Sequence, residues 1–448
     1  KKSATADKDG NWMVTLDPME ASAEGRTLTI TSGLSPHPSS LQDVLVGEVW
    51  LGSGQSNMDS LLGWKPYEAL VSKGREIGDN PLIRYYGMPG YRYFRQSYQI
   101  DGRPVPPPED RTWTVLTPDT ALYSSAVLLF FAARLQEELG VPVAVLNRAV
   151  GATSAGYWLP AGALADDPNC QADIERRRTA LQHRARFRSP GATPAKLPGD
   201  DVIDWATQPQ RDAGGYAARI APLVGFAVRG MCWDQGEYGS GTIVSPVTTL
   251  ACLIRSWRKA WDVEPAEWPV LVVQKPQGYG WRGSFEPLPF AAHRPYLDLG
   301  PYQKHPWAGS GPYHGDGWNY YKVAQRVDDV AIVNSMDLDH SGHPVDKDAY
   351  GYRMADLALA RVYGRKAPHQ SPRFLSAETK ADRIRIRFTG IGEGLRILGD
   401  AERLRGFRIA GSDRVFFDAE AEIVADDTVE VHSSEAPQPK VVLYARPC

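Results

Sequence analysis

The sequence lacks features that mark several classes of protein. It has 50 Lys and Arg against 53 Asp and Glu, so no basic excess indicates a nucleic-acid partner. No apolar run approaches the roughly 18 residues that a membrane span needs. The four cysteines show no CxxC spacing, so they predict neither a zinc site nor a thioredoxin-like motif. We therefore expect no nucleic acid, no membrane and no metal.

The cysteines and the length set further limits. Cys232 and Cys252 lie in apolar runs, which favours buried thiols, and the sequence leaves disulfide formation open. No signal peptide is visible. A chain of 448 residues exceeds the roughly 250–300 residues that one core supports. We expect one large domain with smaller parts appended to it.

Alternating apolar strands and amphipathic helices predict the fold class of the large domain. Apolar runs of strand length alternate with segments of helical periodicity, the pattern of a three-layer α/β domain with a parallel sheet. Gly140 follows one of these helices and is typical of a helix end. The expected strands cover 44–51, 141–147, 227–233, 269–274 and 330–334, and the expected helices cover 125–139, 248–261 and 349–363.

Composition changes divide the chain into three parts. Residues 1–46 are rich in strand formers, with strands expected at 11–16 and 26–30. The α/β domain follows over 47–366, and 367–448 returns to short β runs that predict a β-sandwich-like module. Two irregular stretches inside the α/β domain, 166–215 and 277–319, look like insertions.

The most informative motif follows the first strand of the α/β domain. There the sequence reads Gly-Ser-Gly-Gln-Ser-Asn-Met over 52–58. Small residues at the end of a parallel strand place the hydroxyl of Ser56 at the sheet edge where α/β proteins bind ligands. The alternative, an ordinary strand-to-helix turn capped by Ser56, has about equal weight on spacing alone.

Three further loops follow predicted parallel strands and open on the same edge. Gly151 offers a backbone N–H, Gln235 an amide donor, Glu237 and Asp339 carboxylates, and His343 an imidazole. Each taken singly is also compatible with a plain turn or a structural side chain. Together with a serine they form a complete set of groups for acyl transfer: nucleophile, base, orienting acid and oxyanion donors.

These motifs resemble those of the sialate O-acetylesterase family, which are SGNH hydrolases related to acetylxylan esterases. The block at 47–58 resembles the family's nucleophile block. The segments at 151–158, 233–237 and 342–347 are similar to its GGTxxEAW, WYQGESN and IHPxxK segments. The resemblance extends over nearly the whole chain. It implies an SGNH-hydrolase (flavodoxin-like) α/β/α domain between the two β-rich parts.

The resemblance also implies a reaction: hydrolysis of acetyl esters on sugars without metal or cofactor. Ser56 would attack the acetyl carbonyl, and His343 would act as general base and then general acid. The N–H groups of Ser56 and Gly151, with the Gln235 side chain, would hold the oxyanion. The resulting acetyl-enzyme would then be hydrolysed by water.

Departures from the family pattern leave the orienting acid open. The position three residues before His343 is a histidine, where SGNH enzymes often carry the acid. Glu237 is slightly favoured, Asp339 is the alternative, and a Ser-His dyad steadied by a backbone carbonyl is a third possibility. A carbohydrate-binding protein on a degenerate hydrolase scaffold is the competing hypothesis for function.

The substrate is the least defined part of the prediction. Candidate sugar contacts are Asn57 and Trp158 in the motifs, and Trp281 and Trp307 in the aromatic insertion at 277–319. The insertion's rings serve equally well as a satellite core under a long loop. O-acetylated sialic acid and acetylated xylan both remain candidates. The family's usual substrates favour a secreted or periplasmic protein, and oligomeric state is not predicted.

Overall fold

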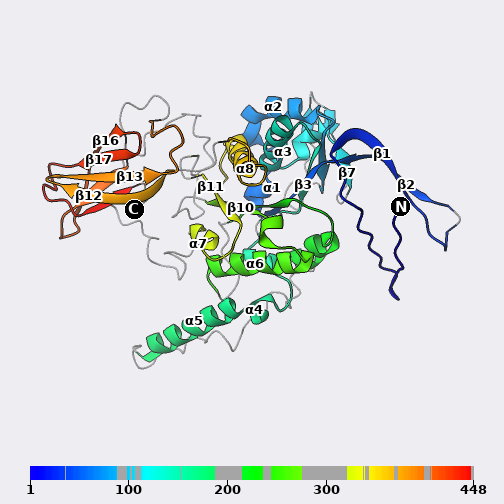
Figure 1. Cartoon of the computed structure of the whole chain (residues 1–448), viewed down its shortest axis with the longest axis horizontal. Coiled ribbons are helices and arrows are strands. Elements are labelled where there is room, and N and C mark those ends of the chain that lie inside the picture. The colour runs from blue at the N-terminus through cyan, green and yellow to red at the C-terminus, as the bar shows by residue number, and fades with distance from the viewer. Residues whose placement is uncertain are drawn as a thin grey trace.

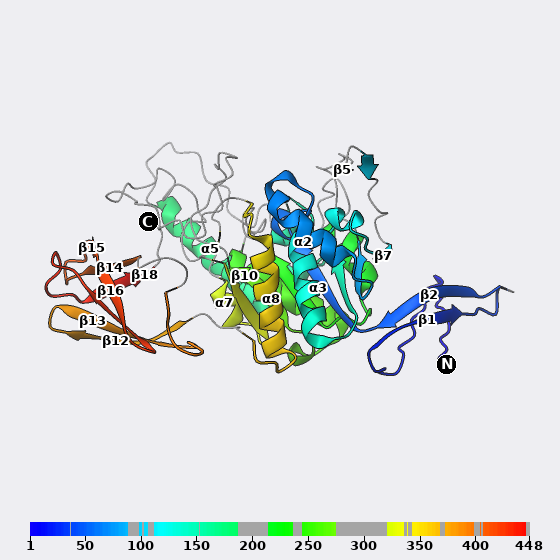
Figure 2. The ribbon, with the colours of Figure 1, turned by 90° about the horizontal axis from the view of Figure 1, so that it is seen from above.

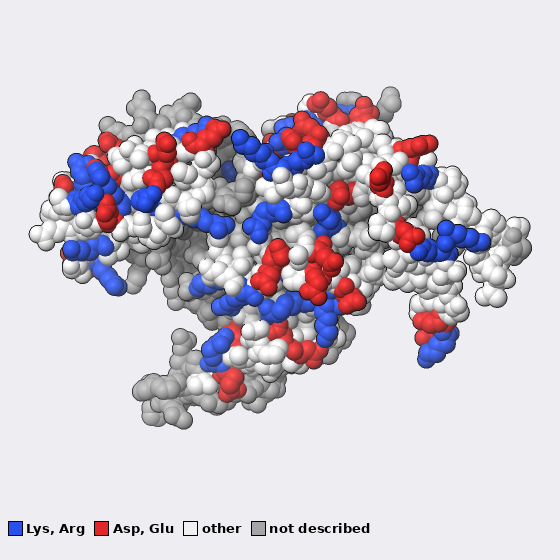
Figure 3. Space-filling model, in the orientation of Figure 1, with Lys and Arg blue, Asp and Glu red and all other residues white. Residues whose placement is uncertain are grey.

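The computed structural model describes most of the α/β domain and of both flanking parts (Figure 1). The described residues are 1–35, 37–87, 98–100, 103–105, 112–151, 153–186, 214–235, 244–274, 320–335, 338, 343–367, 372–397, 404 and 406–444. Among them we find no helix whose length and apolar content suit a membrane span. Acidic and basic side chains are interspersed over the face shown in Figure 3.

A seven-stranded sheet lies at the centre of the α/β domain. Its strands are β3 (Glu48–Gly54), β4 (Ile83–Tyr86), β7 (Trp113–Val115), β8 (Val143–Asn147), β9 (Gly230–Asp234), β10 (Val270–Gln274) and β11 (Val330–Asn334). The order is β11-β10-β9-β3-β8-β4-β7, and every neighbouring pair is parallel except β4 with β7. The predicted parallel α/β sheet is therefore present, with one antiparallel edge strand.

The strand order differs from that of a flavodoxin-like sheet in one respect. Flavodoxin-like sheets pair their first two parallel strands directly. Here the first two parallel strands, β3 and β4, are not neighbours, because β8 lies between them. As a result β3 sits between β8 and β9, near the middle of the sheet, and its carboxyl end opens onto neighbours on both sides.

Helices cover both faces of the sheet, which gives the three layers expected from the sequence (Figures 1 and 2). Successive residues of β3 point to opposite faces: Trp50 packs in one buried cluster and Leu51 in the other. One face carries α2 (Glu68–Gly78), α3 (Ala126–Leu139) and α8 (Lys347–Arg361). The other carries α4 (Ala163–Asp166), α5 (Pro168–Arg186), α6 (Pro246–Trp261) and α7 (Tyr321–Ala324).

Local signals set the ends of these helices. The Ser125 side chain caps α3 by accepting from the Leu128 N–H at 3.1 Å, and Gly140 ends it in the left-handed region at φ +68°. The predicted boundary at Gly140 is confirmed. Short turns complete the domain: 3₁₀ at Lys65–Tyr67, Thr120–Tyr123, Ala155–Trp158, Ala221–Leu223 and Pro265–Glu267, π at Tyr216–Ile220, and a hairpin of β5 (Tyr98–Ile100) and β6 (Arg103–Val105).

Two predicted strands near the N-terminus are corrected. Residues 11–16 form no strand. Among the described residues of this part, the only sheet is the pair β1 (Ser22–Ile30) and β2 (Ser39–Val46), and 11–16 pair with neither strand. The single strand expected over 44–51 is two strands that break at Gly47. A Cβ there would lie 2.0 Å from the carbonyl oxygen of Pro142, so the chain needs glycine at this close approach.

The C-terminal part contains two antiparallel sheets that share one core. The first is β12-β13-β17-β16 and the second β15-β14-β18. Apolar side chains from both sheets, including Ile386 and Ile409, form a single buried cluster, as in a sandwich. The strands are β12 (Arg373–Lys380), β13 (Arg383–Thr389), β14 (Phe407–Ala410), β15 (Phe416–Asp418), β16 (Glu420–Ala425), β17 (Thr428–His432) and β18 (Val441–Tyr444).

Candidate active site

The turn from β3 into α1 (Ser56–Asp59) places Ser56 at the carboxyl edge of the sheet. Gly54 makes the turn with φ +130°, and a Cβ on it would lie 2.2 Å from the carbonyl oxygen of Asp234 on β9. The same carbonyl accepts from the Gln55 N–H at 3.1 Å. Glycine is therefore required at 54, because both the dihedral angle and the close approach exclude a side chain.

Ser56 and His343 meet across this edge. His343 lies just before α8, and its Nε2 is 3.0 Å from the Ser56 Oγ. A hydroxyl within hydrogen-bond distance of an imidazole is the arrangement of a nucleophile and its general base. The structure thus brings together the two residues on which the predicted chemistry depends.

Trp64 contacts the His343 ring. The two rings meet edge to face, with centroids 5.1 Å apart and an interplanar angle of 89°. Trp64 in turn packs edge to face on the buried Tyr67, at 5.4 Å. This pair limits the positions that the imidazole can take. The sequence analysis missed Trp64, because nothing in its spacing after the nucleophile motif points to a histidine far away in the chain.

Asn57 and Lys347 form a fully buried pair directly behind Ser56. The Lys347 Nζ donates to the Asn57 side-chain oxygen at 2.6 Å and to its backbone carbonyl at 3.2 Å. The predicted role of Asn57 as a sugar contact is not supported, since its side chain is buried and held by the lysine. Lys347 opens α8 while Asn57 follows Ser56, so the pair fixes the helix behind His343 to the nucleophile turn.

We predict that Lys347→Met lowers kcat roughly 10–100-fold with a smaller change in KM, because a misplaced Ser56 loses its alignment with His343. Two buried oxygen atoms of Asn57 also lose the hydrogen bonds from Lys347, which costs about 1–3 kcal/mol of stability. Steady-state kinetics and thermal unfolding measure both effects. The matched control is Lys366→Met, at an exposed lysine. A lower Tm with unchanged kcat would show that Lys347 only stabilises the fold.

Gly151 lies beside the nucleophile. A Cβ on Gly151 would lie 3.5 Å from the Ser56 Cβ, which is ordinary contact. Its N–H, predicted as an oxyanion donor, is directed at the Asp59 carboxylate, with Oδ2 at 3.3 Å. The residue is therefore in the predicted place, but Asp59 accepts its N–H. Asp59 is a second site residue that the sequence analysis missed.

Gln235 and Trp158, two residues predicted for the site, are both completely buried. Gln235 follows β9, donates weakly from Nε2 to the Thr153 carbonyl at 3.5 Å and accepts from the Tyr320 hydroxyl at 3.3 Å. Gln235 therefore lies just beyond the carboxyl end of β9, the strand next to β3. Trp158 is a core side chain whose indole N–H donates to the Thr153 hydroxyl at 3.2 Å. Complete burial speaks against the predicted stacking of Trp158 on a sugar.

Several predicted residues lie outside the described residues. They are the two candidate acids Glu237 and Asp339 and the aromatic residues Trp281 and Trp307, together with the whole insertion at 277–319. The predictions about their roles stay predictions.

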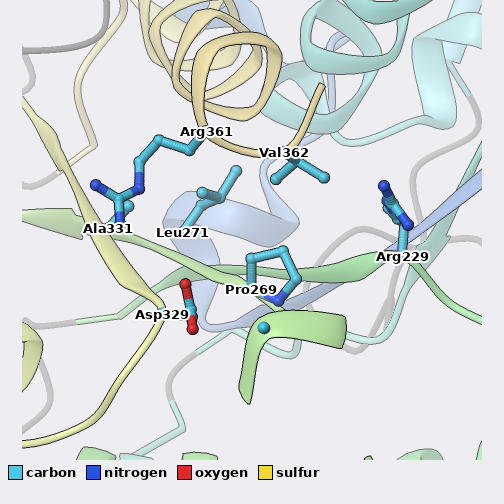
Figure 4. A pocket seen from close by; sticks show the side chains of 8 residues that line it. Arg229, Pro269, Leu271, Asp329, Ala331, Arg361 and Val362 are labelled. Carbon is cyan, nitrogen blue, oxygen red and sulfur yellow. The ribbon is translucent and has the colours of Figure 1, made fainter. Parts of the chain in front are cut away.

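A small pocket of about 90 Å³ lies at the opposite edge of the sheet (Figure 4). It is lined by residues that precede β9, β10 and β11, namely Arg229, Pro269 and Asp329, and by the end of α8. Ser56 follows the carboxyl end of β3, whereas this pocket sits at the amino ends of parallel strands. It is therefore not part of the candidate active site.

Comparison with known proteins supports the motif assignment. No protein-family model matches the chain. It is 25% identical over 404 residues to the sialate O-acetylesterase of Rattus norvegicus, a match that covers 82% of this chain and 66% of that protein. The human sialate O-acetylesterase is 23% identical over 378 residues, covering 79% and 61%. The chain resembles the sialate O-acetylesterases. It spans about two thirds of the length of these sialate O-acetylesterases.

A solved structure gives the same picture for the fold. A carbohydrate acetylesterase from Xanthomonas citri superposes with a TM-score of 0.67 at 24% identity, over 98% of this chain and 84% of that one. At this identity the comparison establishes a shared fold. The match takes in both β-rich parts as well as the α/β domain, as the resemblance to sialate O-acetylesterases predicts.

Proposed function

We propose that this protein is a carbohydrate O-acetylesterase with an SGNH-type α/β/α domain. The observation that carries the proposal is the 3.0 Å contact between the Ser56 Oγ and the His343 Nε2 at the carboxyl edge of the parallel sheet. The resemblance to sialate O-acetylesterases supports the choice of an acetyl ester on a sugar. A binding-only protein would not need the serine and histidine in contact, so the catalytic reading is favoured.

The proposed reaction runs through an acetyl-enzyme. His343 takes the proton of Ser56 as its oxygen attacks the acetyl carbonyl, and then protonates the departing sugar hydroxyl. The N–H groups of Ser56 and Gly151 and the Gln235 amide stabilise the oxyanion. Asp59 accepts the Gly151 N–H in the resting protein. For Gly151 to serve, this N–H turns from the carboxylate to the oxyanion. For Gln235 to serve, an Nε2–H turns from the Thr153 carbonyl to the oxyanion. Water activated by His343 then releases acetate.

The orienting group for His343 is the open part of this mechanism. A carboxylate on the second imidazole nitrogen would fix the tautomer that leaves Nε2 free to accept the serine proton. Glu237 is slightly favoured over Asp339, with a dyad steadied by a backbone carbonyl as the third alternative. Trp64 already restricts the position of the His343 ring. The main role of an acid would therefore be to stabilise the positive charge that the imidazole acquires when it takes the serine proton.

Acetate release from a substrate panel tests the function. The panel holds O-acetylated sialic acid, acetylated xylan and p-nitrophenyl acetate, with a series of longer p-nitrophenyl esters. We expect turnover of acetyl esters, falling as the acyl chain lengthens, and the preferred sugar ester names the substrate class. No acetate from any member, with sugar binding retained, would support the binding-only hypothesis instead.

A further inference from the structure

Two cysteines outside the active site face each other between α5 and α6. Cys170 lies in the first turn of α5 and Cys252 in the first half of α6, and both are free thiols with no exposed surface. Their sulfur atoms lie within 4.8 Å of each other in one buried cluster. Cys232, the third described cysteine, is equally buried on β9 but does not belong to this group.

The two thiols are close enough to influence each other's ionisation. Interaction with Cys252 raises the pKa of Cys170, and the same interaction lowers the pKa of Cys252. In its protonated form Cys252 donates to the Ala163 carbonyl, with sulfur and oxygen 3.3 Å apart. The thiolate is the reactive form of cysteine, so Cys252 is the sulfur that ionises first and attacks a disulfide.

Neighbouring hydrogen bonds fix α6 relative to the chain that leads into α5. The Trp257 indole N–H donates to the Trp158 carbonyl at 3.0 Å. The Arg255 Nε donates to the Asp167 carboxylate at 2.8 Å. Both contacts join α6 to the chain around α4 and the start of α5, so the two sulfur atoms meet on backbones that are already fixed.

A metal ion fits this cluster poorly. Asp167 completes a set of three potential ligands with the two thiols, all within 4.8 Å. Structural zinc takes four ligands, and its thiolates are deprotonated. Here the guanidinium of Arg255 donates to the Asp167 oxygen through two N–H groups. This fixed positive charge occupies the carboxylate and repels a cation.

We propose that Cys170 and Cys252 form a reversible disulfide that ties α5 to α6. The oxidant is a low-molecular-weight disulfide, which reaches the two buried thiols when the contact between α5 and α6 opens locally. The Cys252 thiolate attacks one of its sulfur atoms and expels one thiol, giving a mixed disulfide. Cys170 then attacks the protein sulfur and expels the second thiol. Two electrons pass to the small disulfide, whose two sulfur atoms leave as thiols carrying the two protons.

The crosslink would join two helical segments that each follow a loop of the candidate active site. The segment of α4 and α5 follows the loop of Gly151, and α6 follows the loop of Gln235. A bond from 170 to 252 closes a long loop of chain and removes entropy from the unfolded state. For a domain of this size we expect the Tm to rise by about 5–10 °C on oxidation.

Peptide mapping of the oxidised protein tests the proposal. The reduced protein is treated with oxidised glutathione in its native state, and a second sample is refolded in a glutathione redox buffer. Both are quenched by alkylation and digested. We expect a linked pair of peptides containing Cys170 and Cys252, while Cys232 is found alkylated only after unfolding. The Tm rise should be absent in Cys170→Ala and in Cys252→Ala, and present in Cys232→Ala.

Three outcomes would overturn the proposal. Both cysteines could remain alkylatable after native oxidation and after oxidative refolding. The linkage could involve Cys232 or Cys448 instead. Lastly, the reduced wild type could bind one equivalent of Zn²⁺ that suppresses the Cys170–Cys252 linkage on oxidation, which would assign the cluster to a metal. The wild-type map decides each of these even if a cysteine variant folds poorly.

Discussion

Ser56→Ala is expected to abolish acetate release, lowering kcat by roughly 10⁴–10⁶-fold, because the acetyl group loses the oxygen to which it is transferred. Ser56 is half-buried at the start of α1, and its Oγ faces His343. Removing one oxygen atom there leaves the backbone turn at Gly54 and the Lys347–Asn57 pair intact. Circular dichroism and the Tm should therefore match those of the wild type while turnover is lost.

Ser53→Ala is the matched control for this variant. Ser53 lies three residues earlier on β3, is completely buried, and its Oγ has no hydrogen-bond partner within the described part of the chain. The same atom is deleted in the same motif, but away from His343. We expect turnover close to that of the wild type. Equal activity of Ser56→Ala and the wild type would refute the serine mechanism.

His343→Ala is expected to cost about as much activity as Ser56→Ala, because a nucleophile and its base act as one unit. The double variant Ser56→Ala/His343→Ala should therefore lose no more than either single variant. Removal of the ring also leaves a space beside Trp64. Added imidazole should enter it and restore part of the turnover as an external base.

Two controls make the imidazole experiment specific. The double variant still has the space but lacks the nucleophile, so imidazole should restore nothing there. His432→Ala, on β17 of the C-terminal sheets, should keep wild-type activity. Additive losses in the double variant, or equal rescue with and without Ser56, would mean that His343 does not act on Ser56.

The parts of the fold that depend on local sequence were predictable. Hydrophobic periodicity predicts the apolar strands β8, β10 and β11 and the helix α3, and the helix-ending residue Gly140 predicts where α3 stops. The break at Gly47 was not predictable, because it arises from the carbonyl of Pro142, a contact remote in sequence. Residues 11–16 have strand composition but no partner strand in the described structure.

The sequence predicted the site residues that belong to a recognisable motif. It did not predict those that are placed in the site by tertiary packing. Ser56 and His343 were found from their loops and from the family resemblance. Trp64 and Asp59 owe their place to contacts with His343 and Gly151, which no local pattern encodes. Conversely, Trp158 and Asn57 stand in motifs but are buried, and burial depends on the whole fold.

Trapping the acetyl-enzyme tests the central claim most directly. The protein is mixed with p-nitrophenyl acetate, quenched in acid within the first turnover and digested, and the peptides are analysed by mass spectrometry. The proposed mechanism predicts one acetyl group on the peptide that contains Ser56, located on the Ser56 oxygen and absent from Ser56→Ala. Acetylation of a different residue, or turnover that persists in Ser56→Ala, would contradict it.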